Sequence, residues 1–333
     1  RPDQQPKIVF SNTAVEYWGG GRAAALIHAS PDGRRDLPIP DNVRIYFLAG
    51  TQHEQSVFPP RRARGQQADN PVPQREIFRA LLAGVHGWIT QNVAPPPSRY
   101  PRLSDGTLTP AAGVRFPVIP GVADPRTIAG PGQVRDGRVT RLPHLVPQVD
   151  ADGNDLAGIR APDVSVPVAT NTGWNFRSAS VGGTTEIYNL VGSYIPFAAS
   201  RAEREGRRDP RLSIAERYRD RDDYLAKLRA AADALVKDRY LLADVEHDGV
   251  RLPAGSLVGM HWGAANLDPD AFERPDEYDL DRRPRGLLTF GAGPHLCPGR
   301  NISRLIGEIG IRTLVDRRPG LRSEEHTSEL QSH

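Results

Sequence analysis

Two short apolar runs near the start of the chain predict β-strands. Residues 7–12 read KIVFSN, and Val43–Leu48 read VRIYFL between a Pro-Asp-Asn turn and an Ala-Gly pair. Both runs are rich in the β-branched and aromatic residues typical of buried strands. A third segment, VSVPVAT at 164–170, predicts a strand at a sheet edge, because Pro167 cannot donate a ladder hydrogen bond.

Three further stretches have apolar residues at the three- and four-residue spacing of an amphipathic helix. They cover residues 74–89, residues 224–235 and the segment from about Gly299 onwards. The apolar positions are Ile77, Leu81, Val85, Trp88 and Ile89 in the first, Tyr224, Leu225, Leu228, Ala231, Ala232 and Leu235 in the second, and Ile302, Leu305, Ile306, Ile309 and Leu314 in the third. Ser213 and Glu216 have the S-x-x-E spacing of a capping box. Strands together with helices predict a mixed α/β fold.

Composition and charge narrow the class of protein and of partner. The chain has 333 residues, 38% of them hydrophobic and 25% charged, and a formal net charge of +3. Its basic residues are interleaved with acidic ones, which is typical of solvated helix faces, so we expect neither nucleic acid nor membrane as a partner. A single cysteine excludes an intrachain disulfide and fits a cytoplasmic location.

The string FGAGPHLCPG follows the pattern F-x-x-G-x-x-x-C-x-G through Phe290, Gly293, Cys297 and Gly299. Cys297 precedes the last predicted helix, whose N-terminal amides favour an anionic thiolate. The two glycines allow the backbone to turn sharply and approach the sulfur. An electron-rich thiolate is the ligand that favours O–O cleavage at a haem iron. The string resembles the haem-ligand loop of the cytochrome P-450 superfamily, especially its soluble bacterial members.

This resemblance covers residues 247–321 and includes the upstream segments PAGSLV (253–258), ANLDP (265–269) and FERPDEYDLDR (272–282). It implies a haem whose iron is ligated by Cys297, and a haem propionate bonded by His295. It also implies a redox partner, of the ferredoxin- or flavin-type reductase class, and a small organic substrate. The alternatives are a buried apolar cysteine and a surface histidine. The superfamily's oxygen-binding helix and its E-x-x-R helix have no match in this sequence.

Residues 7–246 resemble a bacterial family of α/β-hydrolase-domain proteins. The matching segments, in order, are residues 16–53, 71–89, 95–103, 149–175 and 209–218. Such hydrolases run nucleophile, acid, histidine along the chain. Glu16 follows the 7–12 strand and His53 follows Val43–Leu48, so the resemblance implies that they are the catalytic acid and base. His53 would take a proton from a serine while Glu16 fixes its tautomer. A structural or surface role for Glu16 stays open.

No G-x-S-x-G motif occurs in the chain, so we expect the nucleophile and the leading strands of the sheet to lie before Arg1, a cut end. The predicted parts are a partial hydrolase domain at 1–246, a partial haem-ligand region at 247–321, and a disordered tail at 322–333. The tail, residues 322–333, reads RSEEHTSELQSH and resembles a translated sequencing adapter.

Three hypotheses for the function follow. The first is a chimera of two incomplete enzymes in which neither chemistry works. The second is a chain derived from a working haem-thiolate monooxygenase, which inserts one oxygen atom from O2 into an organic substrate. The third is an ester or amide hydrolase fragment, of the serine hydrolase type, to which the C-terminal segment is irrelevant.

Overall fold

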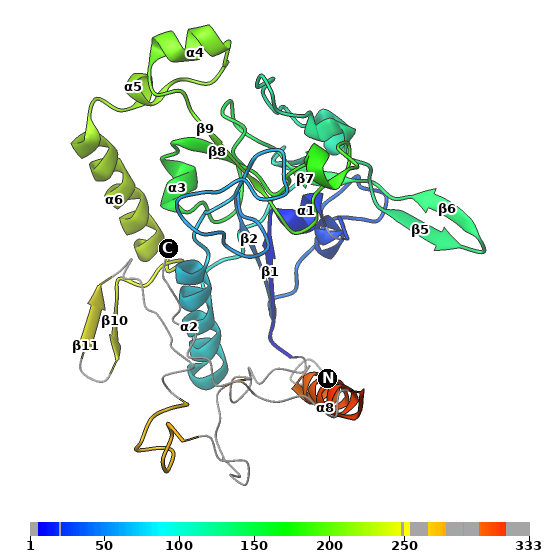
Figure 1. Ribbon diagram of the computed structural model, residues 1–333. Helices are drawn as coiled ribbons and strands as arrows, with labels where there is room; N and C mark the ends of the chain where they lie inside the picture. The colour runs from blue at the N-terminus through cyan, green and yellow to red at the C-terminus, as the bar shows by residue number, and fades with distance from the viewer. Residues whose placement is uncertain are drawn as a thin grey trace. The chain divides into compact units, whose positions relative to one another are not determined.

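The computed structural model describes residues 6–19, 21–247, 250–253, 266–277, 289 and 300–317. The chain divides into two compact units, Arg1–Gly255 and Ser256–His333. As the sequence predicts, the fold is mixed α/β: small sheets and helices make up the first unit (Figure 1).

Two parallel strands form the part of the first unit that positions the candidate site. Strand β1 (Ile8–Thr13) pairs with β2 (Val43–Leu48) in a register that sets Thr13 opposite Leu48. Both strands were predicted, and β2 has the predicted bounds. Because the strands are parallel, their carboxyl ends lie at the same edge of the sheet. On its other side β2 makes parallel bridges to Arg99 and Ile159.

A short helix follows β1 directly. Helix α1 (Val15–Trp18) buries Tyr17 and Trp18, and the 3-10 helix η2 (Ala24–Ile27) comes next. The Tyr17 ring meets Phe47 of β2 edge-on, with ring centroids 5.0 Å apart. This packing fixes α1, and with it Glu16, against the end of the parallel pair.

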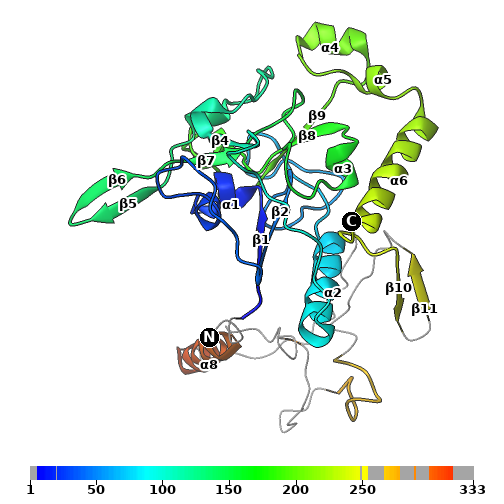
Figure 2. The same ribbon diagram turned by 180° about the vertical axis from the view of Figure 1, so that it is seen from behind.

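The remaining strands of the first unit form small antiparallel sheets. Strands β3 (Ala68–Asp69), β9 (Ser193–Pro196) and β8 (Ala169–Asn171) are ordered β3-β9-β8. Strand β4 (Leu108–Pro110) pairs with β7 (Leu145–Pro147), and β5 (Gly132–Arg135) with β6 (Arg138–Arg141). Both views show the β5–β6 hairpin projecting from the body of this unit (Figures 1 and 2).

The strand predicted over 164–170 is wrong in its first half. Helix α3 (Pro162–Ser165) occupies that half, since Pro162 lies at the start of the helix, where its missing N–H is no loss. Strand β8 begins only at Ala169. It is an edge strand, which agrees with the edge position inferred from Pro167.

The predicted amphipathic helices of the first unit are confirmed as α2 (Arg75–Gln91) and α6 (Arg221–Lys237). Between β9 and α6 lie α4 (Arg201–Arg207) and α5 (Ile214–Arg217). The predicted capping box is present at α5, whereas α6 has its own N-cap in Asp220. Helix α3 packs beside α6.

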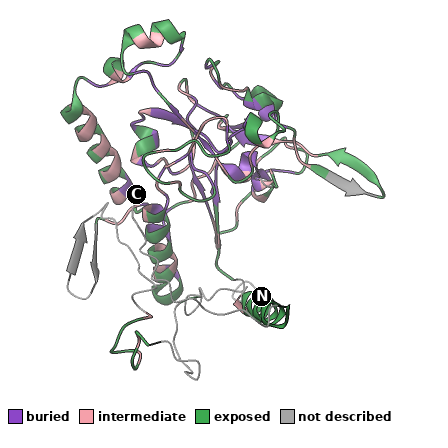
Figure 3. Cartoon of the chain, viewed as in Figure 1, coloured by how far each residue is buried: buried purple, intermediate pink, exposed green. Residues whose placement is uncertain are grey.

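Apolar side chains from β2, β7, α1, α2 and the loops around β8 form one core in the first unit (Figure 3). Its largest fully buried members include Trp18, Tyr17, Tyr46, Phe47 and Ile77. Each fully buried large apolar side chain stabilises the fold by about 1.5–3 kcal/mol. Further 3-10 turns at Ala111–Gly113 (η3), Pro125–Thr127 (η4) and Ala179–Val181 (η5) connect the elements around this core.

The chain then forms a hairpin of β10 (Asp244–His247) and β11 (Val250–Pro253), paired antiparallel. In the second unit, Asp268 begins a turn and accepts the N–H of Asp270 at 3.0 Å. The last predicted helix is confirmed as α8 (Arg300–Arg317). None of the helices in the described part of the chain combines the length and apolarity that a bilayer crossing requires.

Candidate functional site

The two candidate hydrolase residues lie in contact at the carboxyl ends of the parallel strands. Glu16 belongs to α1, just beyond β1, and His53 to the loop beyond β2. His53 Nδ1 lies 2.9 Å from Glu16 Oε1. A carboxylate oxygen that accepts from Nδ1 favours the tautomer with hydrogen on Nδ1, which leaves Nε2 without one. The predicted juxtaposition of the two side chains is therefore confirmed.

The second oxygen of Glu16 is held by a residue at the end of β1. The Thr13 backbone N–H and the Thr13 hydroxyl donate to Glu16 Oε2 at 2.6 and 2.5 Å. Thr13 is buried and paired with Leu48. The carboxylate is thus divided between two partners: Oε2 faces Thr13 and Oε1 faces His53.

The His53 loop is fixed by the buried side chain that precedes it. Gln52 Oε1 accepts the N–H groups of Asn70 at 3.1 Å and Gly192 at 2.9 Å. Gln74, at the start of α2, donates its side-chain amide to the Gln52 carbonyl at 2.6 Å. These bonds join Gln52 to residues around Asn70, Gln74 and Gly192, and so restrict the position of the His53 backbone that follows it.

A buried carboxyl group holds the turn between β2 and His53. Asp155 Oδ2 accepts the N–H of Gly50 at 2.7 Å, and Gly50 has the left-handed φ of +62° that favours glycine. Burial raises the pKa of Asp155 to about 7, against the lowering effect of the Gly50 hydrogen bond. Asp155 is therefore neutral over much of the acidic range, unlike a surface aspartate.

Glycine at 173 allows the loop after β8 to approach the start of α1. A β-carbon at Gly173 would overlap the Ala14 backbone, so any larger residue would displace one of the two segments. Ala14 in turn donates its N–H to the Thr51 carbonyl at 3.2 Å. The turn that carries Glu16 is thus clamped between the β8 loop and the His53 loop.

Two of the other histidines lie beneath α1 and contact Tyr17. His28 Nε2 lies 2.8 Å from the Tyr17 hydroxyl, and His144 Nε2 lies 3.0 Å from the Tyr17 carbonyl. Burial lowers the pKa of His28 to about 4 and also lowers that of His144. Because both stay neutral near pH 7 and His28 is fully buried, their contacts fit a structural role.

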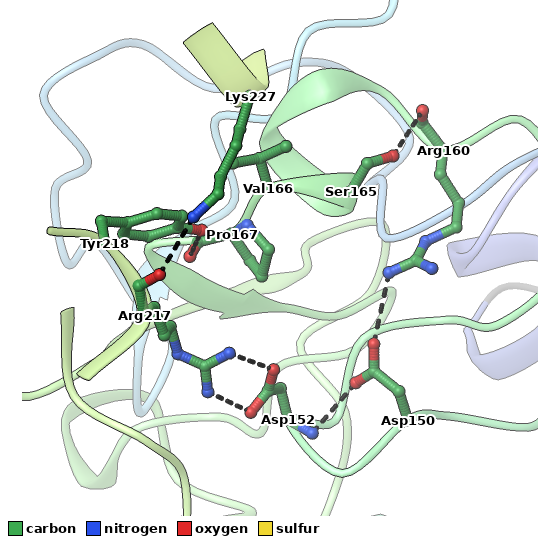
Figure 4. A pocket seen from close by; sticks show the side chains of 9 residues that line it. All are labelled: Asp150, Asp152, Arg160, Ser165, Val166, Pro167, Arg217, Tyr218 and Lys227. Atoms are coloured by element: carbon green, nitrogen blue, oxygen red, sulfur yellow. Dashed lines mark hydrogen bonds and ion pairs between the residues drawn. The ribbon is translucent and has the colours of Figure 1, made fainter. Parts of the chain in front are cut away.

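The described part of the first unit also has a surface pocket of about 500 Å³. Its charged walls are neutralised within the chain (Figure 4): Arg217 forms a two-pronged ion pair with Asp152, and Arg160 lies 3.2 Å from Asp150. Lys227 is bonded to Asp223 at 2.7 Å. Residues of α3, α5, α6 and the 150–160 loop line this pocket. Its charged side chains are paired within the chain, so none of them is left free to bind a charged ligand.

The haem-ligand residues predicted from the sequence lie outside the described residues. They are Phe290, Gly293, His295, Cys297 and Gly299. The described helix α8 begins at Arg300, immediately after this string. Tail residues 322–333 also lie outside the described part.

Sequence reasoning found Glu16 and His53 but missed the residues that hold them. Thr13 and Glu16 have the same T/S-x-x-E spacing that identified Ser213 and Glu216, so the capping-box signal could have found Thr13. Gln52 and Asp155 carry no such local signal. Asp155 meets its partner Gly50 across 105 residues of sequence.

Two family models match the chain. Residues 1–251 match the model described as an alpha/beta hydrolase domain, and residues 228–317 match that of cytochrome P-450. The two matches overlap over 228–251, which includes the end of α6, all of β10 and the first two residues of β11.

Several curated proteins resemble the C-terminal segment. Biflaviolin synthase of Streptomyces coelicolor is 46% identical over 84 residues, which are 25% of this chain and 21% of the synthase. Beta-dihydromenaquinone-9 omega-hydroxylase of Mycobacterium tuberculosis is 52% identical over 64 residues, 19% of this chain and 13% of the hydroxylase. 6-Deoxyerythronolide B hydroxylase of Saccharopolyspora erythraea is 42% identical over 94 residues, which are 28% of this chain and 23% of the hydroxylase. The chain spans between 13% and 23% of the length of these relatives.

Proposed function

Because the chain belongs, through residues 1–251, to the family of alpha/beta hydrolase domains, we propose that Glu16 and His53 are the acid and the general base of a serine-type ester or amide hydrolase. One observation carries this proposal: the 2.9 Å contact between His53 Nδ1 and Glu16 Oε1 at the ends of neighbouring parallel strands.

The two residues have distinct roles in this chemistry. Glu16 accepts the Nδ1 hydrogen, orients the ring and stabilises the imidazolium that forms when His53 takes up a proton. His53 Nε2 is then free to remove the hydrogen of a serine hydroxyl. The His53 side chain is 53% exposed and that of Glu16 is 30% exposed, so the base is accessible while its partner is more sheltered.

The position of the His53 ring hydrogen tests the pair. In the unchanged chain, ¹⁵N NMR of the ring should show hydrogen on Nδ1, as the contact with Glu16 requires. In Glu16→Gln, the two Thr13 donors should take the amide oxygen and turn the NH2 group towards His53. The ring should then switch to the Nε2–H tautomer. His53→Gln identifies the resonances, and the same tautomer in both chains would contradict the proposal.

For the C-terminal segment we infer a haem-thiolate role. The donor set fits: a single thiol, Cys297, just before the N-terminus of an 18-residue helix, where the helix dipole favours the thiolate. Cys297 would bind the iron, His295 would donate to a propionate, and Phe290 would shield the sulfur, with Gly293 and Gly299 allowing the close approach. Bound haem would supply oxygen-activating chemistry.

The partners of this segment follow from the same chemistry. Monooxygenation of a small organic substrate requires electrons, so a ferredoxin- or flavin-type reductase is the expected partner. The segment covers only 21% to 23% of two of the matched relatives. We therefore propose that the 333-residue chain is a chimera of a hydrolase part and a haem-ligand part, in which the haem-ligand part holds only a fraction of a monooxygenase. Because residues 1–333 also contain no G-x-S-x-G motif, we propose that neither reaction runs in this chain unaided.

A further inference from the structure

We propose that Thr13 is a positioning residue that holds the Glu16 carboxylate in the orientation in which one oxygen faces His53. This inference rests on the proposed function of the Glu16–His53 pair and adds a third residue to it. The Thr13 hydroxyl and backbone N–H both donate to one oxygen, Glu16 Oε2, while His53 contacts the other.

The anchor is rigid while the carboxylate by itself is not. Thr13 is the last residue of β1, is 5% exposed and pairs with Leu48. The terminal torsion of a glutamate side chain is broad, so the plane of the carboxylate turns easily when nothing holds it. Two donors from a fixed residue to one oxygen restrict that rotation. The other oxygen then stays directed at His53 Nδ1.

The arrangement differs from the usual capping box. In that motif the hydroxyl oxygen accepts the backbone N–H three residues later. Helix α1 has Ala14 at its N-cap and no side-chain cap hydrogen bond. The Thr13 hydroxyl instead donates to the carboxylate, so its effect is on the orientation of Glu16 rather than on the helix end.

The chain contains a second copy of the same donor arrangement, used for structure. Ser213 donates its N–H and hydroxyl to Glu216 Oε2 at 2.9 and 2.7 Å. Glu216 then pairs with Arg204 at 2.9 Å. Arg204 is permanently charged and has no basic nitrogen to expose. At Thr13 and Glu16 the same donors are present, but the half-exposed His53 takes the place of the arginine. There the arrangement can set the tautomer of the histidine ring.

The ring ¹⁵N spectrum of His53 in the full chain tests this role. Thr13→Val keeps the volume and the β-branch but loses the hydroxyl, and it should lower the ratio of Nδ1–H to Nε2–H tautomer about threefold, the value of one modest net hydrogen bond. Thr13→Ser should restore the unchanged spectrum. Ser213→Ala, which removes the matching hydroxyl at α5, should leave His53 as it is. If Thr13→Val does not fold, Thr13→Ala provides a second hydroxyl-free variant.

The outcomes separate this inference from the function on which it rests. If Glu16→Gln switches the tautomer while the hydroxyl-free variants match the unchanged chain, Thr13 has no positioning role and the pair stands. If Glu16→Gln also leaves the tautomer unchanged, the pair itself is refuted. In the double variant Thr13→Val/Glu16→Gln, the amide loses one of its two fixed donors. A tautomer switch weaker than in Glu16→Gln supports the inference, and a switch of equal size overturns it.

Discussion

We expect Asp155→Asn to be more stable, relative to the unchanged chain, the higher the pH. The difference between their free energies of unfolding should grow as pH rises. Asp155 has a folded pKa of about 7 against 3.8 for an ordinary aspartate. Between these values the folded chain binds the additional proton, so the contribution of Asp155 to stability is present below pH 3.8 and is lost as pH rises through 7. The difference between variant and unchanged chain should grow by about 4 kcal/mol over this window.

Asparagine is the suitable replacement because it keeps an oxygen for the Gly50 N–H and cannot ionise. Urea unfolding followed by tryptophan fluorescence at a series of pH values gives the free energy directly. Asp41→Asn, which changes an exposed aspartate, is the control. A difference between Asp155→Asn and the unchanged chain that stays constant with pH would show that Asp155 ionises over the same pH range in the folded and the unfolded chain, and would contradict the raised pKa.

His28→Gln should produce the opposite trend. Burial lowers the pKa of His28 to about 4 from 6.5, so between these values the unfolded chain binds more protons. The stability that depends on neutral His28 is present above pH 6.5 and is lost as pH falls through 4. The free energy of unfolding of His28→Gln, measured relative to that of the unchanged chain, should therefore increase by about 3 kcal/mol as pH falls from 6.5 to 4.

The loss of ring contacts would lower the stability of His28→Gln at every pH, so the trend with pH and not the mean is the relevant result. His86→Gln provides the control, since His86 lies on α2 away from the buried Tyr17 network. If His28→Gln runs parallel to the unchanged chain from pH 4 to 6.5, His28 is protonated in the folded state and the buried, neutral assignment is wrong. In the unchanged chain the effects of Asp155 and His28 oppose each other, which predicts a flatter stability profile than either variant has.

The elements predicted from the sequence are those whose patterns are local and long. The β1 and β2 runs and the stripes of α2, α6 and α8 have enough residues for their spacing to be read. Strands such as β3 and β4 have two and three residues, too few for any periodicity. The strand expected over 164–170 failed in its first half because Pro162 starts a helix there, a local effect that the apolar composition of VSVPVAT concealed.

In the candidate site, too, the residues marked by a local pattern were predicted and those that depend on long-range contacts were not. Glu16 and His53 could be found because each directly follows a predicted strand and the order acid, histidine is fixed in hydrolases. Asp155 could not, because its contact with Gly50 depends on how distant loops approach each other. The exposed apolar side chains of α8, such as Ile302 and Ile306 at 64% and 65% exposure, were predicted as one helix face, but a spacing pattern does not specify what such a face packs against.

The claim that this chain joins a hydrolase part to an incomplete haem-thiolate part is tested most directly by its spectrum with haem. The full chain is expressed with added haem, reduced and exposed to carbon monoxide, with Cys297→Ser as the control. A haem needs protein on both faces, and each Å² of apolar surface left in water forfeits about 25 cal/mol. We predict that haem does not bind near stoichiometry and that no stable thiolate-type Soret shift appears. A stable shift at near-stoichiometric haem that Cys297→Ser abolishes would show a complete pocket and contradict the chimera.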